Sequence, residues 1–210
     1  MITFEEYENA LKQRHGERIY NILSHSSVAI DGLGGLGSNI AMYLARAGVG
    51  HLHLVDFDKV DITNLNRQQY DIADLGTLKT DALTKNIKRF NPFIEITSQC
   101  VKVNEDNAAE IFGGYKIVCE AFDKAENKAK LVNSILSECG DTKIVSGSGM
   151  AGFGSSNTIV TRKINDRFYL CGDAESDMND GLALAAPRVA ICAAHEANMI
   201  LRLLIGEKEV

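Results

Sequence analysis

A glycine-rich stretch near the N-terminus constrains the fold of this chain more than any other segment. It reads "DGLGGLGSN" over residues 31–39, with glycines at positions 32, 34, 35 and 37. The β-rich run "SSVAID" precedes it, and a helical pattern follows, with Ile40, Leu44 and Ala47 spaced to share one face. A strand that enters a glycine turn and continues into a helix typically opens an α/β sheet.

Strand-like and helix-like segments then alternate along the chain. The strands are expected at 26–31, 51–57, 94–100, 116–121 and 143–148, and the helices at 4–22, 36–50, 79–91, 104–114, 124–139 and 186–205. This rhythm predicts an α/β fold with a Rossmann-like, doubly wound sheet and a parallel core. Two β-rich runs at 155–164 and 167–172 have no helix between them. They predict an antiparallel extension of the sheet in the C-terminal third.

We therefore expect one nucleotide-binding domain over residues 1–210. Its Rossmann-like core would span 26–150, and the antiparallel extension and the C-terminal helix would span 151–210. The length suits one sizeable core better than two domains.

Charge and composition exclude several classes of function. The formal net charge is -6 and no basic run occurs, which argues against a nucleic-acid partner. The most apolar stretch, 181–206, is interrupted by charged side chains, so a buried helix is expected there rather than a membrane span. The N-terminus lacks the apolar core of a signal peptide, and a cytoplasmic location is expected. Five cysteines without a Cys-x-x-Cys pair argue against a disulfide framework and a tetrathiolate zinc site.

The glycine loop predicts an anion site. Gly32 would form the tight turn, Gly34 would let a ligand approach the backbone, and Gly37 would let the helix pack on the strand. The helix N-terminus then presents free N–H groups to a phosphate. Asp56 ends the second strand, where an acid often binds ribose hydroxyls, although it would also serve as a helix cap. These features alone fit NAD and ATP equally.

The residues that follow favour a triphosphate. Cleaving a triphosphate requires fixed cations and a carboxylate for Mg²⁺. Arg67 lies in a polar loop, and Lys79 begins a helix, where the helix dipole disfavours a cation unless an anion is near. Asp123 follows the fourth strand at the edge where ligands bind in open α/β sheets. It would either hold Mg²⁺ or cap the next helix, and Lys79 would otherwise be an ordinary surface lysine.

The run "GLGGLGSNIAMYLARAGVGHLHLVDFDKVDITNLNRQ", followed by a lysine after "DLGTL", resembles the ThiF/MoeB adenylyltransferases, relatives of the ubiquitin-activating enzymes. The resemblance covers residues 28–163. The C-terminal run "CGD…APRV…AAHEAN…LRLL" is similar to the short bacterial ThiF-like proteins that act on the sulfur carrier ThiS. Gly35, the extra glycine outside the dinucleotide pattern, is part of this resemblance.

The resemblance implies an activity. The C-terminal glycine of a small ubiquitin-like sulfur carrier ending in Gly-Gly would attack the α-phosphorus of ATP, and pyrophosphate would leave. For a ThiS-like carrier this step belongs to the thiazole branch of thiamine biosynthesis. The implied cofactors are ATP and Mg²⁺, and the implied assembly is a homodimer.

The resemblance also assigns roles to individual residues. They are Gly32, Gly34, Gly35 and Gly37 for the phosphates, Asp56 for ribose, Asn64 and Arg67 for the phosphates with Gln68 nearby, Lys79 for charge on the α-phosphate, and Asp123 for Mg²⁺. An arginine before the first strand would reach into the partner subunit's site. Arg14 and Arg18 both qualify, and Arg14 is preferred.

Three departures from the family pattern matter. The two Cys-x-x-Cys pairs of longer members are absent, so no zinc is expected. Lys124 replaces the usual amide after the magnesium acid. Cys171, read as a loop cysteine between polar residues and glycine, is a possible thiol for a covalent intermediate, and a structural role is favoured.

Other functions remain open. Within the family they are adenylation of a molybdopterin-type carrier and an ATP-dependent dehydratase that modifies tRNA. Outside it they are an NAD-dependent oxidoreductase, for which residues 150–210 offer too small a substrate domain, and a binding protein without turnover.

Overall fold

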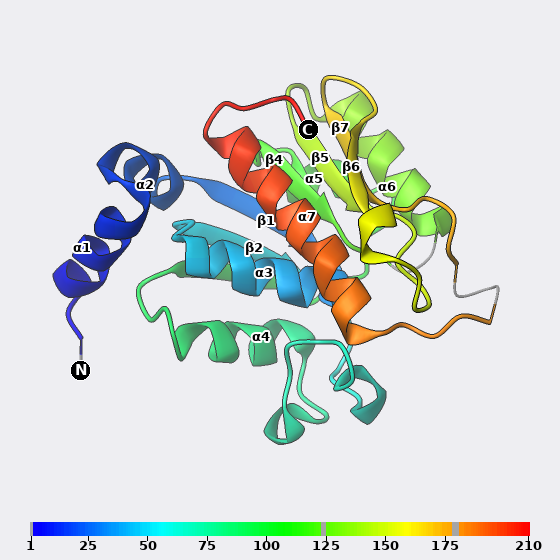
Figure 1. The fold of residues 1–210 in the computed structure, drawn as a ribbon, viewed down its shortest axis with the longest axis horizontal. Coiled ribbons are helices and arrows are strands. Elements are labelled where there is room, and N and C mark those ends of the chain that lie inside the picture. Colours follow the sequence, from blue (N-terminus) through cyan, green and yellow to red (C-terminus); the bar gives the residue numbers. More distant parts are fainter. Residues whose placement is uncertain (1, 123–124, 178–180) are drawn as a thin grey trace.

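One seven-stranded sheet organises the molecule (Figure 1). The computed structural model describes residues 2–122, 125–177 and 181–210. The strand order is β3-β2-β1-β4-β5-β7-β6, and every neighbouring pair is parallel except β6 with β7. The strands are β1 (Ser27–Asp31), β2 (His51–Val55), β3 (Glu95–Gln99), β4 (Ile117–Glu120), β5 (Lys143–Gly147), β6 (Val160–Lys163) and β7 (Phe168–Gly172). The expected Rossmann-like parallel core is confirmed.

The antiparallel part of the sheet is narrower than the sequence suggested. Strand β7 runs parallel to β5, and the antiparallel strand is β6, at the outer edge. Tyr169 and Cys171 of β7 are fully buried, whereas Val160 of β6 is exposed. The more apolar strand therefore takes the inner position beside the core, although it comes later in the chain.

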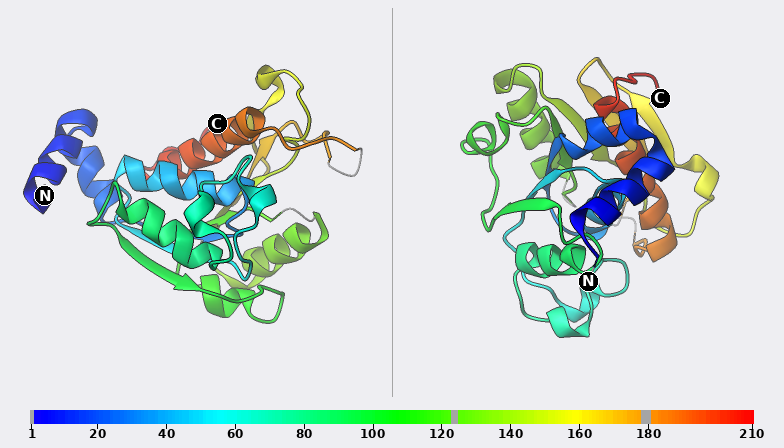
Figure 2. Two further views of the ribbon diagram at one scale, coloured as in Figure 1. Left: turned by 90° about the horizontal axis from the view of Figure 1, so that it is seen from below. Right: turned by 90° about the vertical axis from the view of Figure 1, so that its left-hand side faces the viewer.

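Helices cover both faces of the sheet (Figure 2). They are α1 (Phe4–His15), α2 (Glu17–Ser24), α3 (Gly35–Ala47), α4 (Lys79–Lys88), α5 (Ala108–Phe112), α6 (Ala125–Glu138) and α7 (Ala186–Leu204). Helices α3, α4 and α7 pack on one face, and α5 and α6 pack on the other. The expected single helix over 4–22 is two helices, because Gly16 takes a φ of +81° that breaks the helical ladder.

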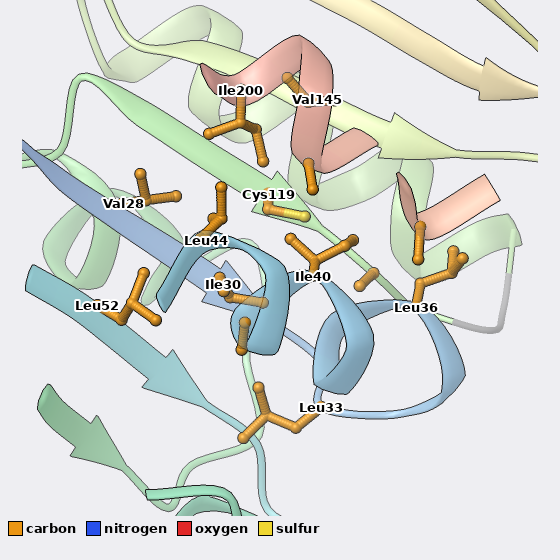
Figure 3. Packing of buried hydrophobic residues seen from close by; sticks show 14 of the residues in the cluster. Val28, Ile30, Leu33, Leu36, Ile40, Leu44, Leu52, Cys119, Val145 and Ile200 are labelled. Atoms are coloured by element: carbon orange, nitrogen blue, oxygen red, sulfur yellow. The ribbon is translucent and has the colours of Figure 1, made fainter. Parts of the chain in front are cut away.

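The larger core lies between α3, α7 and the centre of the sheet (Figure 3). Ile40 and Leu44 of α3 and Ile200 of α7 are fully buried above Ile30 and Cys119. This packing fixes the start of α3 against the carboxyl ends of β1 and β4, where the glycine loop lies. Across the described ranges, no helix combines the length and the apolar character that a membrane span requires.

Candidate functional site

A cavity of about 540 Å³ opens at the carboxyl edge of the sheet. Its floor includes the ends of β1, β2, β4 and β5. In open α/β sheets this edge is where ligands bind. The structure brings these predicted residues to the cavity wall: Gly32, Gly34, Gly35, Asp56, Asn64, Arg67, Gln68 and Lys79.

The glycines of the loop divide into two kinds. A side chain on Gly37 would place its Cβ 1.8 Å from the carbonyl oxygen of Gly32, so Gly37 allows α3 to begin tightly against the turn. Gly32 has a φ of +85° and lies against the carbonyl of Ala121. Gly32, Gly34 and Gly35 all border the cavity, whereas Gly37 does not line it. Among the described residues no side chain caps α3, so its first N–H groups are available to bind an anion.

Asp56 joins the glycine loop to the end of β2. Its Oδ2 accepts a hydrogen bond of 2.6 Å from the N–H of Leu33, and its Oδ1 accepts one of 2.8 Å from the N–H of Asp58. The carboxylate is buried at the cavity wall. Each oxygen of a carboxylate has a second lone pair, so Asp56 can also accept hydrogen bonds from a ligand.

Lys79 is the first residue of α4 and is only 5% exposed. Its ammonium group lies 2.8 Å from Oδ2 of Asp58 and 3.9 Å from Oδ2 of Asp56. The anion expected beside this helix N-terminus is therefore supplied by the protein's own carboxylates. Asp58 is a cavity residue that the sequence analysis did not assign, although it lies in the same "DFDK" segment as Asp56.

Arg67 and Gln68 follow a short 3-10 turn, η1 (Ile62–Asn64), which Asp61 and Asn64 cap reciprocally. The Nη1 of Arg67 donates to the carbonyl of Thr63 and to the side chain of Asn66. The Nε of Arg67 and the Oε1 of Gln68 are buried, and neither has a hydrogen-bond partner among the described residues. Buried polar atoms are normally paired, so two such atoms beside a cavity indicate a polar ligand.

The loop that carries Arg67 is held against the start of α3. The side-chain amide of Asn39 donates to the carbonyl of Arg67, and the hydroxyl of Tyr70 donates to the carbonyl of Leu33. Burial, with help from nearby carboxylates including Asp56, raises the pKa of Tyr70 far above its usual value. Tyr70 therefore stays a neutral donor that fixes the position of the glycine loop.

Asp123, the expected magnesium acid, lies outside the described residues, as does Lys124. Over the part of the chain that is described, no group of three or more His, Cys, Asp or Glu side chains is arranged to hold a metal ion. The described residues include a cavity cation that the sequence did not indicate. Lys128 of α6 lines the cavity, and its ammonium group lies 2.5 Å from Oε2 of Glu120.

Residues 147–151 and 174–177 form another part of the cavity wall. Arg188, in the first turn of α7, holds it through hydrogen bonds to Asp173, Thr158 and the carbonyls of Gly154 and Ser155. Although burial opposes it, hydrogen bonds from residues 175 and 176 and from Arg188 lower the pKa of Asp173 to about 2. The pair is therefore charged across the neutral range and keeps this wall in place.

Three candidates lie away from the cavity of their own chain. Arg14 in α1 and Arg18 in α2 are exposed, and both helices lie beyond the amino end of β1, at the opposite edge of the sheet (Figure 1). Cys171 is not in a loop, because it lies in β7 and is fully buried. Burial, and then the carboxyl of Glu196, raise the pKa of Cys171 to about 12, so its thiolate is scarce near neutral pH.

Comparison with known proteins identifies relatives of this chain. A model of the ThiF family matches residues 7–210. The adenylyltransferase and sulfurtransferase UBA4 of Scheffersomyces stipitis is 39% identical over 129 residues, which cover 61% of this chain and 29% of that protein. UBA4 of Saccharomyces cerevisiae is 34% identical over 155 residues, which cover 71% of this chain and 35% of that protein. The matches thus span about a third of these relatives' length.

Among solved structures, the Escherichia coli tRNA N6-threonylcarbamoyladenosine dehydratase TcdA, in complex with ATP, is similar with a TM-score of 0.86. The match covers 98% of this chain and 97% of that chain at 22% identity, a level that shows a shared fold. The family match extends over nearly the whole chain, from α1 to the C-terminus. The chain belongs to the ThiF family, the group of ThiF/MoeB-type proteins related to the ubiquitin-activating enzymes.

Proposed function

We propose that this protein uses ATP to adenylate the C-terminal glycine of a small ubiquitin-like sulfur carrier of the ThiS type, in thiamine thiazole biosynthesis. One observation carries the proposal. The uncapped start of α3, Arg67 and Lys79 all face a single cavity, and the Nε of Arg67 and the Oε1 of Gln68 are buried there without partners among the described residues. The free N–H groups and the two cations suit a polyphosphate, whereas the Oε1 of Gln68, which can only accept, suits a hydroxyl or amine of the same ligand.

The nucleotide would use the cavity as follows. Its phosphates would lie on the N–H groups at Gly34 and Gly35, and Arg67 would bind them from the side. Asp56, fixed by two backbone N–H groups, would accept a ribose hydroxyl. Asn64 and Gln68 would complete the polar wall. Lys79 would turn from Asp58 toward the phosphates, which carry more negative charge than one carboxylate.

The chemistry requires position and charge rather than a base. An oxygen of the carrier's terminal carboxylate forms a bond to the α-phosphorus, and the bond from that phosphorus to the bridging oxygen breaks. Pyrophosphate leaves with the electron pair, and no proton has to move because the nucleophile is already ionised. Lys79 and Arg67 would stabilise the charge that grows on the α-phosphate. Mg²⁺, which we propose Asp123 to hold, would neutralise charge on the phosphates.

We further propose that the enzyme is a cytoplasmic homodimer. Arg14 and Arg18 lie at the edge of the sheet opposite the cavity, so either would act only on the cavity of a second copy. The similarity to UBA4, an adenylyltransferase and sulfurtransferase, supports a sulfur-carrier substrate.

A second candidate is ATP-dependent dehydration of a modified adenosine in tRNA. The full-length similarity of the fold to TcdA favours it. The net charge of -6, without a basic run, favours a protein carrier over tRNA. A molybdopterin-type carrier would undergo the same adenylation chemistry as a ThiS-like one.

ATP–pyrophosphate exchange tests these proposals. The protein is incubated with ATP, Mg²⁺ and carriers of the ThiS or molybdopterin type, each intact or without its Gly-Gly end, and with tRNA in a separate reaction. Exchange with the intact ThiS-like carrier alone is the expected result. Exchange with the molybdopterin-type carrier alone would identify that carrier as the substrate. ATP-dependent modification of the tRNA would favour the dehydratase. No exchange with any carrier, together with tight NAD binding, contradicts the proposal.

Variants test the assigned residues. Lys79→Ala and Asp123→Ala are each expected to lower exchange by at least about tenfold while the fold persists. Lys85→Ala is the matched control, because Lys85 lies on the same helix as Lys79 and pairs with Asp74 outside the cavity. It should leave exchange within about twofold of the wild-type rate. Unchanged exchange in Lys79→Ala would remove the role proposed for that lysine.

A further inference from the structure

Asp31, the residue directly before the glycine loop, is the least satisfied carboxyl group at the cavity. It ends β1, is only 1% exposed and lines the cavity floor. Its Oδ2 is fully buried and has no hydrogen-bond partner among the described residues. A buried polar atom without a partner is costly, so its retention beside a cavity points to a ligand that completes it.

In the two neighbouring carboxyl groups, both oxygens already accept hydrogen bonds from the protein. Glu120, the partner of Asp31 across the β1–β4 ladder, accepts hydrogen bonds from the N–H of Phe122, the ammonium of Lys128 and the hydroxyl of Ser146. Asp56 accepts two backbone N–H groups, as described above. Of these three carboxyls, only Asp31 has a buried oxygen without any hydrogen-bond partner among the described residues.

The side chain of Asp31 lies on the face of the sheet that α5 and α6 cover. Residues two apart on a strand share a face, and Ala29 of the same strand packs in the core cluster under α5 and α6. Val101, Val103 and Phe122 pack against that cluster and also line the cavity. Asp31 therefore lies on the side of the cavity that α6 covers, where Val101, Val103 and Phe122 supply apolar surface beside the Glu120–Lys128 pair.

The apolar part of the cavity suits the sugar and base of a nucleotide. Burial first, and then the carboxylates of Glu120 and Asp56, raise the pKa of Asp31 well above its usual range. A neutral carboxyl group both donates and accepts hydrogen bonds, and it tolerates an apolar surrounding better than a carboxylate does. An uncharged hydroxyl or amine is the complementary partner.

We propose that Asp31 binds the nucleoside part of the nucleotide by accepting a hydrogen bond at Oδ2 from a sugar hydroxyl or from the exocyclic amine of the base. This proposal rests on the proposed function, because it requires an adenine nucleotide in the cavity. It makes Asp31 a specificity residue that is maintained at the expense of stability.

Calorimetric binding of nucleotides to Asp31→Val and Asp31→Asn tests the proposal. Asp31→Val is expected to weaken ATP binding by about five- to tenfold, the effect of losing one hydrogen bond in a buried site. Asp31→Asn, which keeps an acceptor oxygen of similar shape, should recover most of the affinity. The urea midpoint of Asp31→Val should rise, because valine removes a buried group without a partner. Asp141→Val, an exposed change just before β5, is the control.

Three ATP analogues identify the group that Asp31 binds. They are 2′-deoxy-ATP, 3′-deoxy-ATP and the purine riboside triphosphate that lacks the exocyclic amine. The analogue without the partner group should bind the wild-type protein and Asp31→Val with equal affinity, whereas the other two should distinguish the proteins as ATP does.

The proposal is overturned if Asp31→Val binds ATP within twofold of the wild type, or if the variant loses affinity and stability together, as a purely structural residue would. If the wild-type chain binds no adenine nucleotide, both this inference and the proposed function fail. If the wild type binds ATP but shows no exchange with any carrier, only the proposed function fails.

Discussion

The ammonium group of Lys79 lies 2.8 Å from the carboxylate of Asp58, and both groups line the same cavity. The Lys79 side chain is buried, whereas the Asp58 side chain is half-exposed. The carboxylate thus neutralises a buried cation and can turn toward solvent when another anion arrives. If a nucleotide binds in this cavity as proposed, Asp58 would compete with its phosphates for Lys79.

Replacing Asp58 with asparagine should separate ATP binding from turnover. The variant loses the competing charge, so ATP is expected to bind about two- to fivefold more tightly at low salt, and less so at high salt. Exchange at saturating ATP should fall, because Lys79 is no longer held in one orientation. Equilibrium binding and exchange at two salt concentrations provide the measurements. Weaker ATP binding by Asp58→Asn would show that Asp58 itself contacts the nucleotide.

Alanine at two glycines of the loop should have different effects, on stability at Gly37 and on ATP affinity at Gly34. In Gly37→Ala the new Cβ would meet the carbonyl oxygen of Gly32 at 1.8 Å, so the free energy of unfolding should fall by about 3 kcal/mol. In Gly34→Ala the nearest atom is the side-chain nitrogen of Gln68 at 3.9 Å. The fold should persist there, but the methyl group narrows the approach to the backbone, and ATP affinity should fall. Urea titration and nucleotide binding distinguish the two effects, and similar stability of both variants would contradict the steric argument.

Glu196 of α7 should make the protein less stable as the pH rises. Its side chain is fully buried and packs closely against the backbone of Gly147, where an added Cβ would lie 2.5 Å from the Oε1 of Glu196. Burial raises the pKa of Glu196 to about 8; the Glu120 carboxylate adds to the rise and the Lys128 ammonium opposes it. The folded state therefore keeps a proton that the unfolded chain releases near its ordinary pKa, and stability falls between about pH 4.5 and pH 8.

The variant Glu196→Gln cannot ionise and should lose this dependence. Between pH 5 and pH 8 the wild-type protein should lose roughly 4 kcal/mol more of its free energy of unfolding than the variant does. Urea midpoints at several pH values measure the difference, with exposed Glu207→Gln as the control. Parallel curves for the wild type and Glu196→Gln would show that Glu196 does not carry the effect.

The cysteines should differ sharply in reactivity. Cys100 is exposed, and the other four, Cys171 among them, are buried. Under native conditions one thiol per chain should react rapidly with a disulfide reagent, and Cys100→Ser should abolish that reaction. Cys171→Ser should keep ATP–pyrophosphate exchange, because a buried thiol with a raised pKa is a poor nucleophile. A covalent carrier adduct that disappears in Cys171→Ser would contradict this expectation.

The sequence was informative wherever local pattern decides structure. Apolar spacing and glycines located the helices and parallel strands to within a few residues, since periodicity and turn residues act over short distances. The carboxyl ends of parallel strands meet at one edge of a sheet, so Asp56 and Asp123, which follow two of these strands, could be expected at that edge from the sequence. The local pattern did not reveal the break at Gly16, where a positive φ divides the expected first helix into two.

Long-range packing decided the rest. The place of β7 beside β5 depends on which strand of the hairpin has more apolar surface to bury, and that choice turned Cys171 from an expected loop residue into a core residue. The pairing of Lys79 with Asp58 and the isolation of the Asp31 oxygen depend on how neighbouring strand ends fill the cavity floor. The sequence by itself determined the order of elements and the loop at 31–39. Only the tertiary structure determined which polar atoms are paired, because burial and partners are set by residues far apart in the chain.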